Sequence, residues 1–323
     1  MGNDVKEIVL AAVSPLNKLI DLVSKGIGTI YEPYKIRKHA DAMAYKLEVL
    51  SKSIGNTNNV SIEYKDENLQ IQLHELQERA MQRFVYQEVQ RQFNIEDIAD
   101  KTADILKNRE IQSNEDVSFN WISRFIDSAK DVTESEIKDL WAKVLAGEII
   151  QPNTVSLRTL DVLKYMSTKD AELFMKVMPF IINNSYIPNS TELLAKYGIS
   201  YDDILKLDEC GLINSSGMVS SHFNINSDNN ILFNNENIAC IIKSNNERNM
   251  EIREYVLTKS GTELKKIIGI ATRNDFLIDY AKEIKKQYSN MHVCVHIISS
   301  IDENGKIITY NETIDLITSD DNI

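Results

Sequence analysis

Three residues near the carboxyl end of the sequence carry side chains that are able to bind a metal ion. His292, Cys294 and His296 alternate in the string HVCVH, and alternate residues of a β-strand point to the same face. Imidazole and thiolate groups are good zinc ligands. Successive positions on one face of a strand are, however, about 7 Å apart, which is too far for one ion without further ligands. A half-buried strand with Val293 and Val295 on its other face explains the pattern as well, and we favour that interpretation.

Two charged residues flank the junction between two predicted helices. Arg158 lies in SLRTL, near a helix start, where a positive charge is unfavourable to the helix dipole. Glu148 precedes it near the end of the previous helix. We therefore predict a structural ion pair between Glu148 and Arg158, in preference to a phosphate-binding role for the arginine.

The helix before this junction contains an unexpected glycine. The string ESEIKDLWAKVLAGEI predicts an amphipathic helix over residues 134–149, with Trp141 on its apolar face. Gly147 costs about 1 kcal/mol of helix propensity, but it lets another backbone approach closely. Since Pro152 prevents continuation of the helix, we interpret Gly147 as a packing residue rather than part of a reactive site.

The sequence contains no motif that specifies a reaction. It has no phosphate-binding glycine loop, no His-Glu zinc helix and no nucleophile elbow. We therefore expect a protein without a cofactor or a catalytic site. A hydrolase or nuclease stays as a minor alternative, because catalytic groups from distant positions leave no such motif.

The length and composition are those of a folded protein of two or three domains. The 323 residues are too many for one simple core. A net charge of −12 argues against broad electrostatic binding to nucleic acid. Three scattered cysteines fit a reducing compartment. With no secretory signal and no apolar run long enough to span a membrane, we expect the cytoplasm, with the inner membrane face as a peripheral location.

The first segment, residues 1–112, predicts a helical arm. Its first helix has an apolar face at helical spacing, made of Ile8, Val9, Ala12, Val13, Leu16, Leu19, Ile20 and Val23. Pro15 should begin or kink a helix, Gly26 and Gly28 should act as stop signals, and a basic cluster of Lys35, Arg37 and Lys38 follows. Two interpretations stay open. We favour packing on the same domain or on a partner subunit, and the alternative is a helix lying in the membrane plane.

The rest of the arm predicts one long helix from about residue 67 to 94, followed by a shorter one. Its apolar stripe is Leu69, Leu73, Leu76, Ala80 and Phe84. The stripe is coiled-coil-like and favours a homo-oligomer.

Residues 113–185 predict a bundle of four helices, near 116–130, 134–149, 156–166 and 168–183. A hydroxyl residue followed three positions later by an acid is a capping box. Such pairs are found here and in the next segment at Ser113/Asp116, Thr133/Glu136, Ser167/Asp170 and Ser200/Asp203.

Residues 186–269 predict a winged-helix-like domain, since two short helices are followed by short extended runs and another helix. That outline suggests DNA binding as a possible function. However, the segment to residue 270 has eight Lys and Arg against eleven Asp and Glu, and its second helix carries Asp202, Asp203, Asp208 and Glu209. We therefore favour protein contacts of this acidic carboxyl-terminal half over DNA readout.

Residues 270–323 predict a small α+β element, in which a helix precedes two strands joined at Asn304-Gly305. The fold class that follows is mainly α, with an arm, a bundle, a winged-helix-like unit and this carboxyl-terminal element.

Several strings give the chain a family resemblance. LWAKVLAGEI followed by SLRTLDVLKYMSTKDAELF resembles the bacterial family called domain of unknown function 2806, and LVSKGIGTIYEPYKIRKHADAMAYK, QEVQRQFNIEDI and YVLTKSGTELKKI fit the same family. The resemblance implies no activity and no catalytic residue. It is compatible with a non-enzymatic interaction protein that acts as a sensor or effector in phage defence through self-assembly or membrane association. The alternative is a winged-helix DNA-binding transcription regulator.

Overall fold

The computed structural model describes two compact units of the chain, Met1–Leu160 and Asp161–Ile323. Within them it describes residues 14–28, 61–65, 68–72, 76–113, 115–216, 219–301 and 307–314. This division differs from the four predicted segments. The predicted bundle is divided between the two units, and the two carboxyl-terminal segments belong to one unit.

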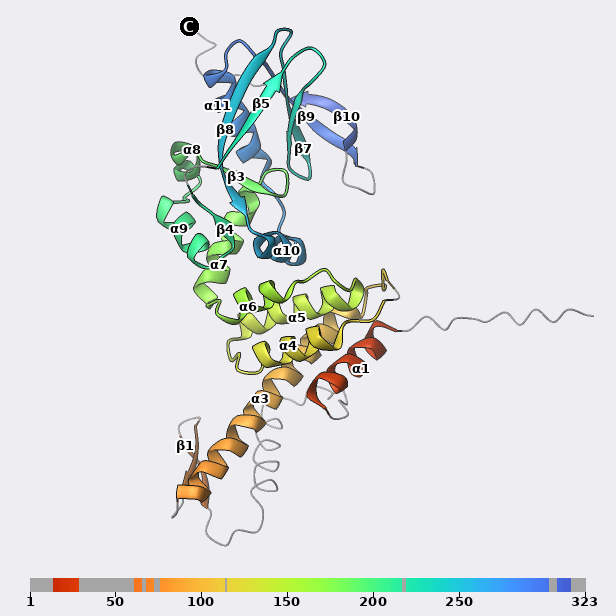
Figure 1. Ribbon diagram of the computed structural model, residues 1–323, viewed down its shortest axis with the longest axis vertical. Coiled ribbons are helices and arrows are strands. Elements are labelled where there is room, and N and C mark those ends of the chain that lie inside the picture. Colours follow the sequence, from red (N-terminus) through yellow and green to blue (C-terminus); the bar gives the residue numbers. More distant parts are fainter. Residues whose placement is uncertain are drawn as a thin grey trace, which may run out of the picture. The chain divides into compact units, whose positions relative to one another are not determined.

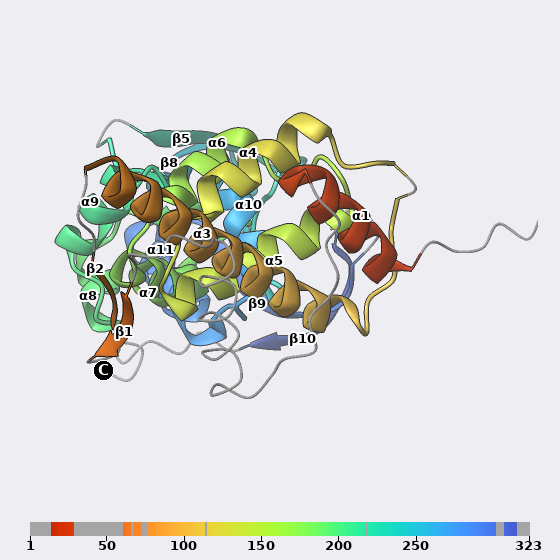
Figure 2. The same cartoon turned by 90° about the horizontal axis from the view of Figure 1, so that it is seen from below.

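The first unit is built from helices that pack around two tryptophans (Figure 1). Its helices are α1 (Pro15–Ile27), α3 (Leu76–Leu106), α4 (Phe119–Ala129), α5 (Ser135–Ile150) and the start of α6 (Leu157–Lys164). α1 packs on α4, and α3 packs along α5 (Figure 2). The core contains Trp121 and Trp141, with Phe125 stacked on the first at 5.2 Å and edge-on to the second at 5.1 Å between ring centroids.

α1 shows how local sequence sets the bounds of a helix. It begins at Pro15, whose fixed φ suits the first helical turn. It ends at Gly28, which adopts a left-handed φ of 73° as the cap. Both bounds agree with the sequence signals. Gly26, inside the helix, allows close contact with α4, since an added Cβ would lie 2.9 Å from the Ile122 side chain.

Ion pairs also join α3 to α5. Lys138 is buried, and its Nζ lies 2.9 Å from an Asp97 carboxylate oxygen. Lys101 lies 2.6 Å from Asp139 in the same way. These pairs fix the relative register of the two helices along their shared contact.

The predicted start of the long helix is wrong. The segment Asn68–Gln72 forms strand β2, which pairs antiparallel with β1 (Ser61–Lys65). Leu69 and Ile71 alternate with polar residues in this segment, and period-two alternation is typical of a strand. The helix then runs from Leu76 to Leu106 as one element, where the sequence predicted two.

In its described residues, the second unit combines helices with two antiparallel sheets (Figure 1). After the end of α6 its helices are α7 (Thr168–Val177), the short 3₁₀ turn η1 (Met178–Phe180), α8 (Thr191–Lys196), α9 (Tyr201–Glu209), α10 (Lys259–Ile268) and α11 (Asn274–Gln287). In the first sheet, β8 (Arg248–Leu257) is central and pairs with β3 (Tyr186–Pro188), β4 (Ile213–Asn214) and β5 (Ser220–Ile225). The second sheet has the order β10 (Ile307–Ile314), β9 (His292–Ile301), β7 (Ile238–Lys243) and β6 (Ile231–Asn234).

These sheets correct the predicted fold class. The fold is mixed α/β rather than mainly α, and no separate winged-helix-like unit is present among the described residues. The physical reason is long-range strand pairing. β7 pairs with β9 over the whole stretch from Ile238↔Ile297 to Lys243↔His292, so segments 186–269 and 270–323 share one sheet. The DNA-binding alternative therefore loses the structural unit on which it depended.

Two of the predicted capping boxes form as expected. Ser167 with Asp170 begins α7, and Ser200 with Asp203 begins α9, each with both reciprocal hydrogen bonds. The box at Thr133 does not form, because the residue at the start of α5 is Glu134 and its side chain makes no capping bond.

Candidate functional site

Glu148 organises the turn that follows α5. Its side chain is 2% exposed, and its carboxylate accepts backbone N–H bonds from Asn153 at 2.7 Å, Thr154 at 3.1 Å and Val155 at 2.9 Å. The Thr154 hydroxyl donates a further bond at 3.2 Å. Burial raises the pKa of Glu148, although these donors act in the opposite direction. The carboxylate is therefore a structural group that closes the turn.

The predicted ion pair between Glu148 and Arg158 is not formed. The donors to Glu148 are the backbone and the Thr154 hydroxyl, while Arg158 is exposed in the first turn of α6. The turn offers three N–H groups without helical partners, and these satisfy a buried carboxylate as well as a guanidinium does.

Trp141 and Gly147 lie inside α5, as predicted. Trp141 is fully buried, and its indole nitrogen has no hydrogen-bond partner in the structure as described. Gly147 is half-buried, and its carbonyl accepts the N–H of Gln151 at 3.0 Å in the last turn. The role of Gly147 in a close helix contact stays a prediction.

His292, Cys294 and His296 lie on one strand, β9, but they do not converge on one point. The Cys294 Sγ lies 3.2 Å from the Nε2 of His292, while the Nδ1 of His296 lies 3.2 Å from the Thr313 hydroxyl. Val293 and Val295 on the other face are buried. In the described ranges, no group of three or more His, Cys, Asp or Glu side chains is placed to hold a metal ion.

The predicted membrane or assembly face of the first helix is partly described. Leu19 and Val23 are buried, and Leu16 and Ile20 are half-buried, in a helix that contacts α3, α4 and α5. This agrees with packing on the same domain. The remaining residues of that face and of the basic cluster lie outside the described residues: Ile8, Val9, Ala12, Val13, Lys35, Arg37 and Lys38. Across the described part of the chain, none of the helices is both long and apolar enough to cross a membrane.

The first part of α3 carries an exposed apolar surface. Met81 is 63% exposed and Phe84 is 59% exposed, and Ala80 beside them is also exposed. We call these three residues the α3 patch. Gln82, on the opposite side of the helix, is buried. This part of α3 extends beyond α1, α4 and α5 (Figure 1). Sequence periodicity identified Ala80 and Phe84 but missed Met81, which lies at the edge of the stripe.

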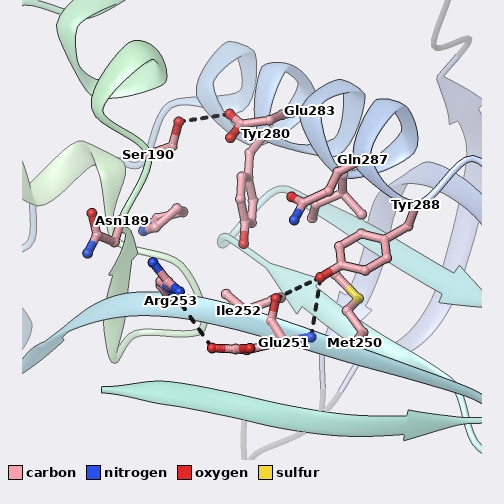
Figure 3. A pocket seen from close by; sticks show the side chains of 12 residues that line it. Asn189, Ser190, Met250, Glu251, Ile252, Arg253, Tyr280, Glu283, Gln287 and Tyr288 are labelled. Atoms are coloured by element: carbon pink, nitrogen blue, oxygen red, sulfur yellow. Dashed lines mark hydrogen bonds and ion pairs between the residues drawn. The ribbon is translucent and has the colours of Figure 1, made fainter. Parts of the chain in front are cut away.

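The second unit contains a polar cavity of about 280 Å³ between α11 and β8. Figure 3 shows Tyr280 of α11 pointing into this cavity, with Arg253 of β8 across from it. The Tyr288 hydroxyl donates to the Glu251 carbonyl at 2.9 Å and accepts its N–H at 3.3 Å. We call this the α11 cavity. Sequence reasoning missed it, because its residues come from distant segments without a common motif.

The charged groups of the α11 cavity have partners within the cavity wall. The Ser190 hydroxyl donates to Glu283 at 3.0 Å, and Arg253 lies 3.8 Å from Glu251 (Figure 3). Burial raises the pKa of Tyr280, so its phenol stays protonated at neutral pH. A serine bound to a glutamate without a histidine is not an activated nucleophile. The pair therefore does not by itself make Ser190 a nucleophile.

Comparison with known proteins identifies one family. The model of the family described as protein of unknown function (DUF2806) matches residues 78–194 and 185–281, which together cover most of the chain. No curated protein and no solved structure matches the chain.

Proposed function

The chain belongs to the DUF2806 family of proteins of unknown function, and from this premise we propose that it is a non-enzymatic bacterial interaction protein that self-associates through the α3 patch. The observation that carries the proposal is the exposure of Met81 and Phe84 in the first part of α3, where Gln82 on the other side of the helix is buried. Large apolar side chains grouped on one rigid element are typical of protein contact sites.

The spacing of the patch favours a second copy of the same chain as its partner. Met81 and Phe84 are three residues apart, and Ala80 and Phe84 are four apart, so all three lie on one helical face. A two-fold symmetric pair brings the same surface together from both copies. The small side chain of Ala80 then leaves room for a phenyl ring of the other helix, as in a coiled-coil contact.

The size of the patch sets the expected strength of association. Burying the exposed parts of Met81 and Phe84 in two copies contributes about 4–8 kcal/mol. The loss of translational and rotational freedom costs about 4–15 kcal/mol. We therefore expect a reversible, concentration-dependent dimer rather than a permanent one.

The test is the molar mass of the full-length protein, measured by light scattering over a range of concentrations. The wild-type mass should rise with concentration, and a Met81→Gln/Phe84→Gln double variant should stay monomeric. Phe119→Gln is the matched control, because Phe119 is 67% exposed at the start of α4, away from the patch. It should associate as the wild type does. A wild-type protein that stays monomeric up to about 1 mM contradicts the proposal.

The setting that we propose is defence against phage, with the protein as a sensor or effector and with a partner protein on its acidic carboxyl-terminal half. Bacteria that express the wild-type protein should then form fewer plaques than bacteria without it. The Met81→Gln/Phe84→Gln variant should lose this protection. Equal plaque numbers for all three strains, over a panel of phages, contradict the role in defence without affecting the self-association measured in vitro.

A further inference from the structure

Strand β5 lies at an edge of the first sheet. It pairs with β8 in an unbroken antiparallel register from Ser220↔Arg253 to Ile225↔Arg248, and no other described strand pairs with it. An edge strand carries a row of backbone N–H and C=O groups that point away from its sheet. We call the outer side of β5, from Ser220 to Ile225, the β5 edge.

The neighbouring strand shows which backbone groups lie on the β5 edge. The Tyr288 hydroxyl accepts the Glu251 N–H at 3.3 Å and donates to the Glu251 carbonyl at 2.9 Å, so both groups of Glu251 point away from β5. His222 is directly opposite Glu251. In such a non-hydrogen-bonded pair, the groups of both residues point away from the partner strand. The N–H and C=O of His222 therefore lie on the β5 edge, as do those of Ser220 and Asn224 at alternate positions.

Side chains close two other strand edges of the second unit. The Tyr288 hydroxyl takes up both backbone groups of Glu251 on the outer side of β8. The side-chain amide of Asn183 closes β6, where it donates to the Leu232 carbonyl at 3.2 Å and accepts the Asn234 N–H at 2.7 Å. These contacts satisfy backbone groups that would otherwise offer pairing sites to another strand.

The β5 edge is closed only at its far end. The Asn224 carbonyl accepts the Asn229 side-chain amide at 3.0 Å. The backbone groups of Ser220 and His222 that point outwards have no partner among the described residues. The strand also lacks the usual protection of an edge, since its string SSHFNI contains no proline and no acid, lysine or arginine.

A cavity of about 480 Å³ lies along the β5 edge. Its lining includes residues 221–224 of β5 and residues 231–233 of β6, which are consecutive in each strand. Side chains alternate between the two faces of a strand, so consecutive residues line one cavity where the edge of the strand faces it. The two strands belong to different sheets. The cavity therefore separates an open strand edge from one that Asn183 has closed.

We propose that an extended segment of a partner protein binds along the β5 edge as an added strand, antiparallel to β5. Backbone hydrogen bonds supply affinity in this mode of recognition, and alternate side chains supply specificity. The proposal rests on the proposed role as an interaction protein and gives its partner a mode of binding. It does not involve the α3 patch, which belongs to the other unit.

The side chains around the cavity define the chemistry of the segment. Phe223 and Leu232 line the cavity and are half-buried, so apolar side chains at alternate positions of the segment would cover them. Glu254 lies on the Phe223 face of the sheet, where it accepts the Ser221 hydroxyl at 2.7 Å. None of the described residues that line the cavity is Lys or Arg. An acidic side chain on that face of the segment would therefore meet repulsion without a compensating positive charge.

The test uses the full-length protein and a fluorescent peptide of about seven residues, a usual strand length, in which lysine and valine alternate. Residues directly opposite in an antiparallel pair share a face. With valine on the Phe223 face, the lysines are opposite Ser220, His222 and Asn224, and their N–H groups point at β5. Anisotropy at about 0.15 M salt should show saturable binding below about 1 mM. N-methylation of the lysines should weaken it about tenfold or more. N-methylation of the valines, at equal charge, should leave it within about twofold.

Substitutions in β5 test the same contact from the side of the protein. His222→Pro removes an N–H that β8 does not use, and proline is tolerated on an edge strand where its nitrogen faces outwards. This variant should keep the fold and lose peptide affinity about tenfold or more. His222→Ala is the matched control, because it keeps the N–H, and it should bind as the wild type does. Ser220→Pro, at the first residue of the strand, is a second variant with the same expectation if His222→Pro does not fold.

Three results would each overturn the proposal. The first is the absence of saturable binding of the unmodified peptide up to about 1 mM. The second is an equal effect of the two N-methylated peptides, which would show attraction between opposite charges without strand pairing. The third is a folded proline variant that binds as the wild type does. The Met81→Gln/Phe84→Gln variant should bind the peptide unchanged, so failure of self-association and failure of strand addition are separately measured.

Discussion

Replacing Glu148 with alanine tests whether one buried carboxylate maintains the turn after α5. The carboxylate accepts three backbone N–H bonds, from Asn153, Thr154 and Val155, and one hydroxyl bond. Alanine removes all four contacts with the carboxylate, so the three N–H groups lose their partner within the protein. The same turn positions the Val155 carbonyl, which accepts the indole N–H of Trp121 at 2.8 Å. The substitution should therefore affect the packing of the first unit as well as the turn.

The expected magnitude follows from how well water can replace the carboxylate. Val155 is 3% exposed, so its N–H would be left unsatisfied, at about 1–3 kcal/mol. Asn153 is exposed and Thr154 is half-buried, so water should recover most of their bonding. Relief of the burial penalty on the charged carboxylate offsets part of the loss. We expect Glu148→Ala to lower the free energy of unfolding by about 1–3 kcal/mol.

The assay is chemical denaturation together with hydrogen exchange of the amides in residues 153–155. Glu136→Ala is the control, because Glu136 is exposed in the first turn of the same helix. It should cost less than about 1 kcal/mol. If Glu148→Ala costs no more than the control, or leaves the exchange of the Thr154 and Val155 amides unchanged, then the turn does not depend on the carboxylate and the reasoning fails.

Two further predictions concern the second unit. Gly261→Ala places a Cβ 2.0 Å from the Leu212 carbonyl oxygen, so we expect a loss above about 3 kcal/mol in thermal unfolding. Ser260→Ala, next to it, removes a buried hydroxyl that has no partner in the described structure and should change stability by less than about 1 kcal/mol; equal effects of the two variants would contradict the contact. Burial acts to raise the pKa of Asp279, but the bonds from Lys196 at 2.6 Å and from Tyr197 at 2.7 Å outweigh it and lower the pKa. This stabilisation is present above the ordinary carboxyl pKa and is lost as the pH falls through the lowered value. Asp279→Asn should therefore reduce the loss of unfolding free energy on acidification by about 1 kcal/mol. The prediction is refuted if the variant loses as much stability at low pH as the wild type does.

Local signals in the sequence predicted local structure well. Pro15 and Gly28 bound α1, and the serine–aspartate pairs at α7 and α9 form their capping boxes. In each of these cases the groups that interact are within four residues of one another. The information is therefore complete in a short string, and tertiary packing has little to override.

Long-range pairing could not be read in the same way. The strings that form β6 and β7 were recognised as extended, but β7 also pairs with β9, which lies about fifty residues further on. Without that partner, the neighbouring helices and strands matched the outline of a winged-helix domain. The error in fold class has this single cause. The error at Asn68–Gln72 is different in kind. A short apolar run next to a long helix fits both the helical period of 3.6 residues and the strand period of two.

The candidate sites show that residue type alone is a weak guide to where chemistry is possible. The string HVCVH contains three good metal ligands, yet Cys294 approaches only His292 while His296 has a different neighbour, Thr313. Glu148 and Arg158 have opposite charges, yet backbone N–H groups of the intervening turn are closer partners for the carboxylate. Tyr186 stood out in no motif, but the register of β3, β5 and β8 places it beside a buried acid. Convergence of groups from several elements, rather than their presence in one string, is what gathers the residues that line the α11 cavity.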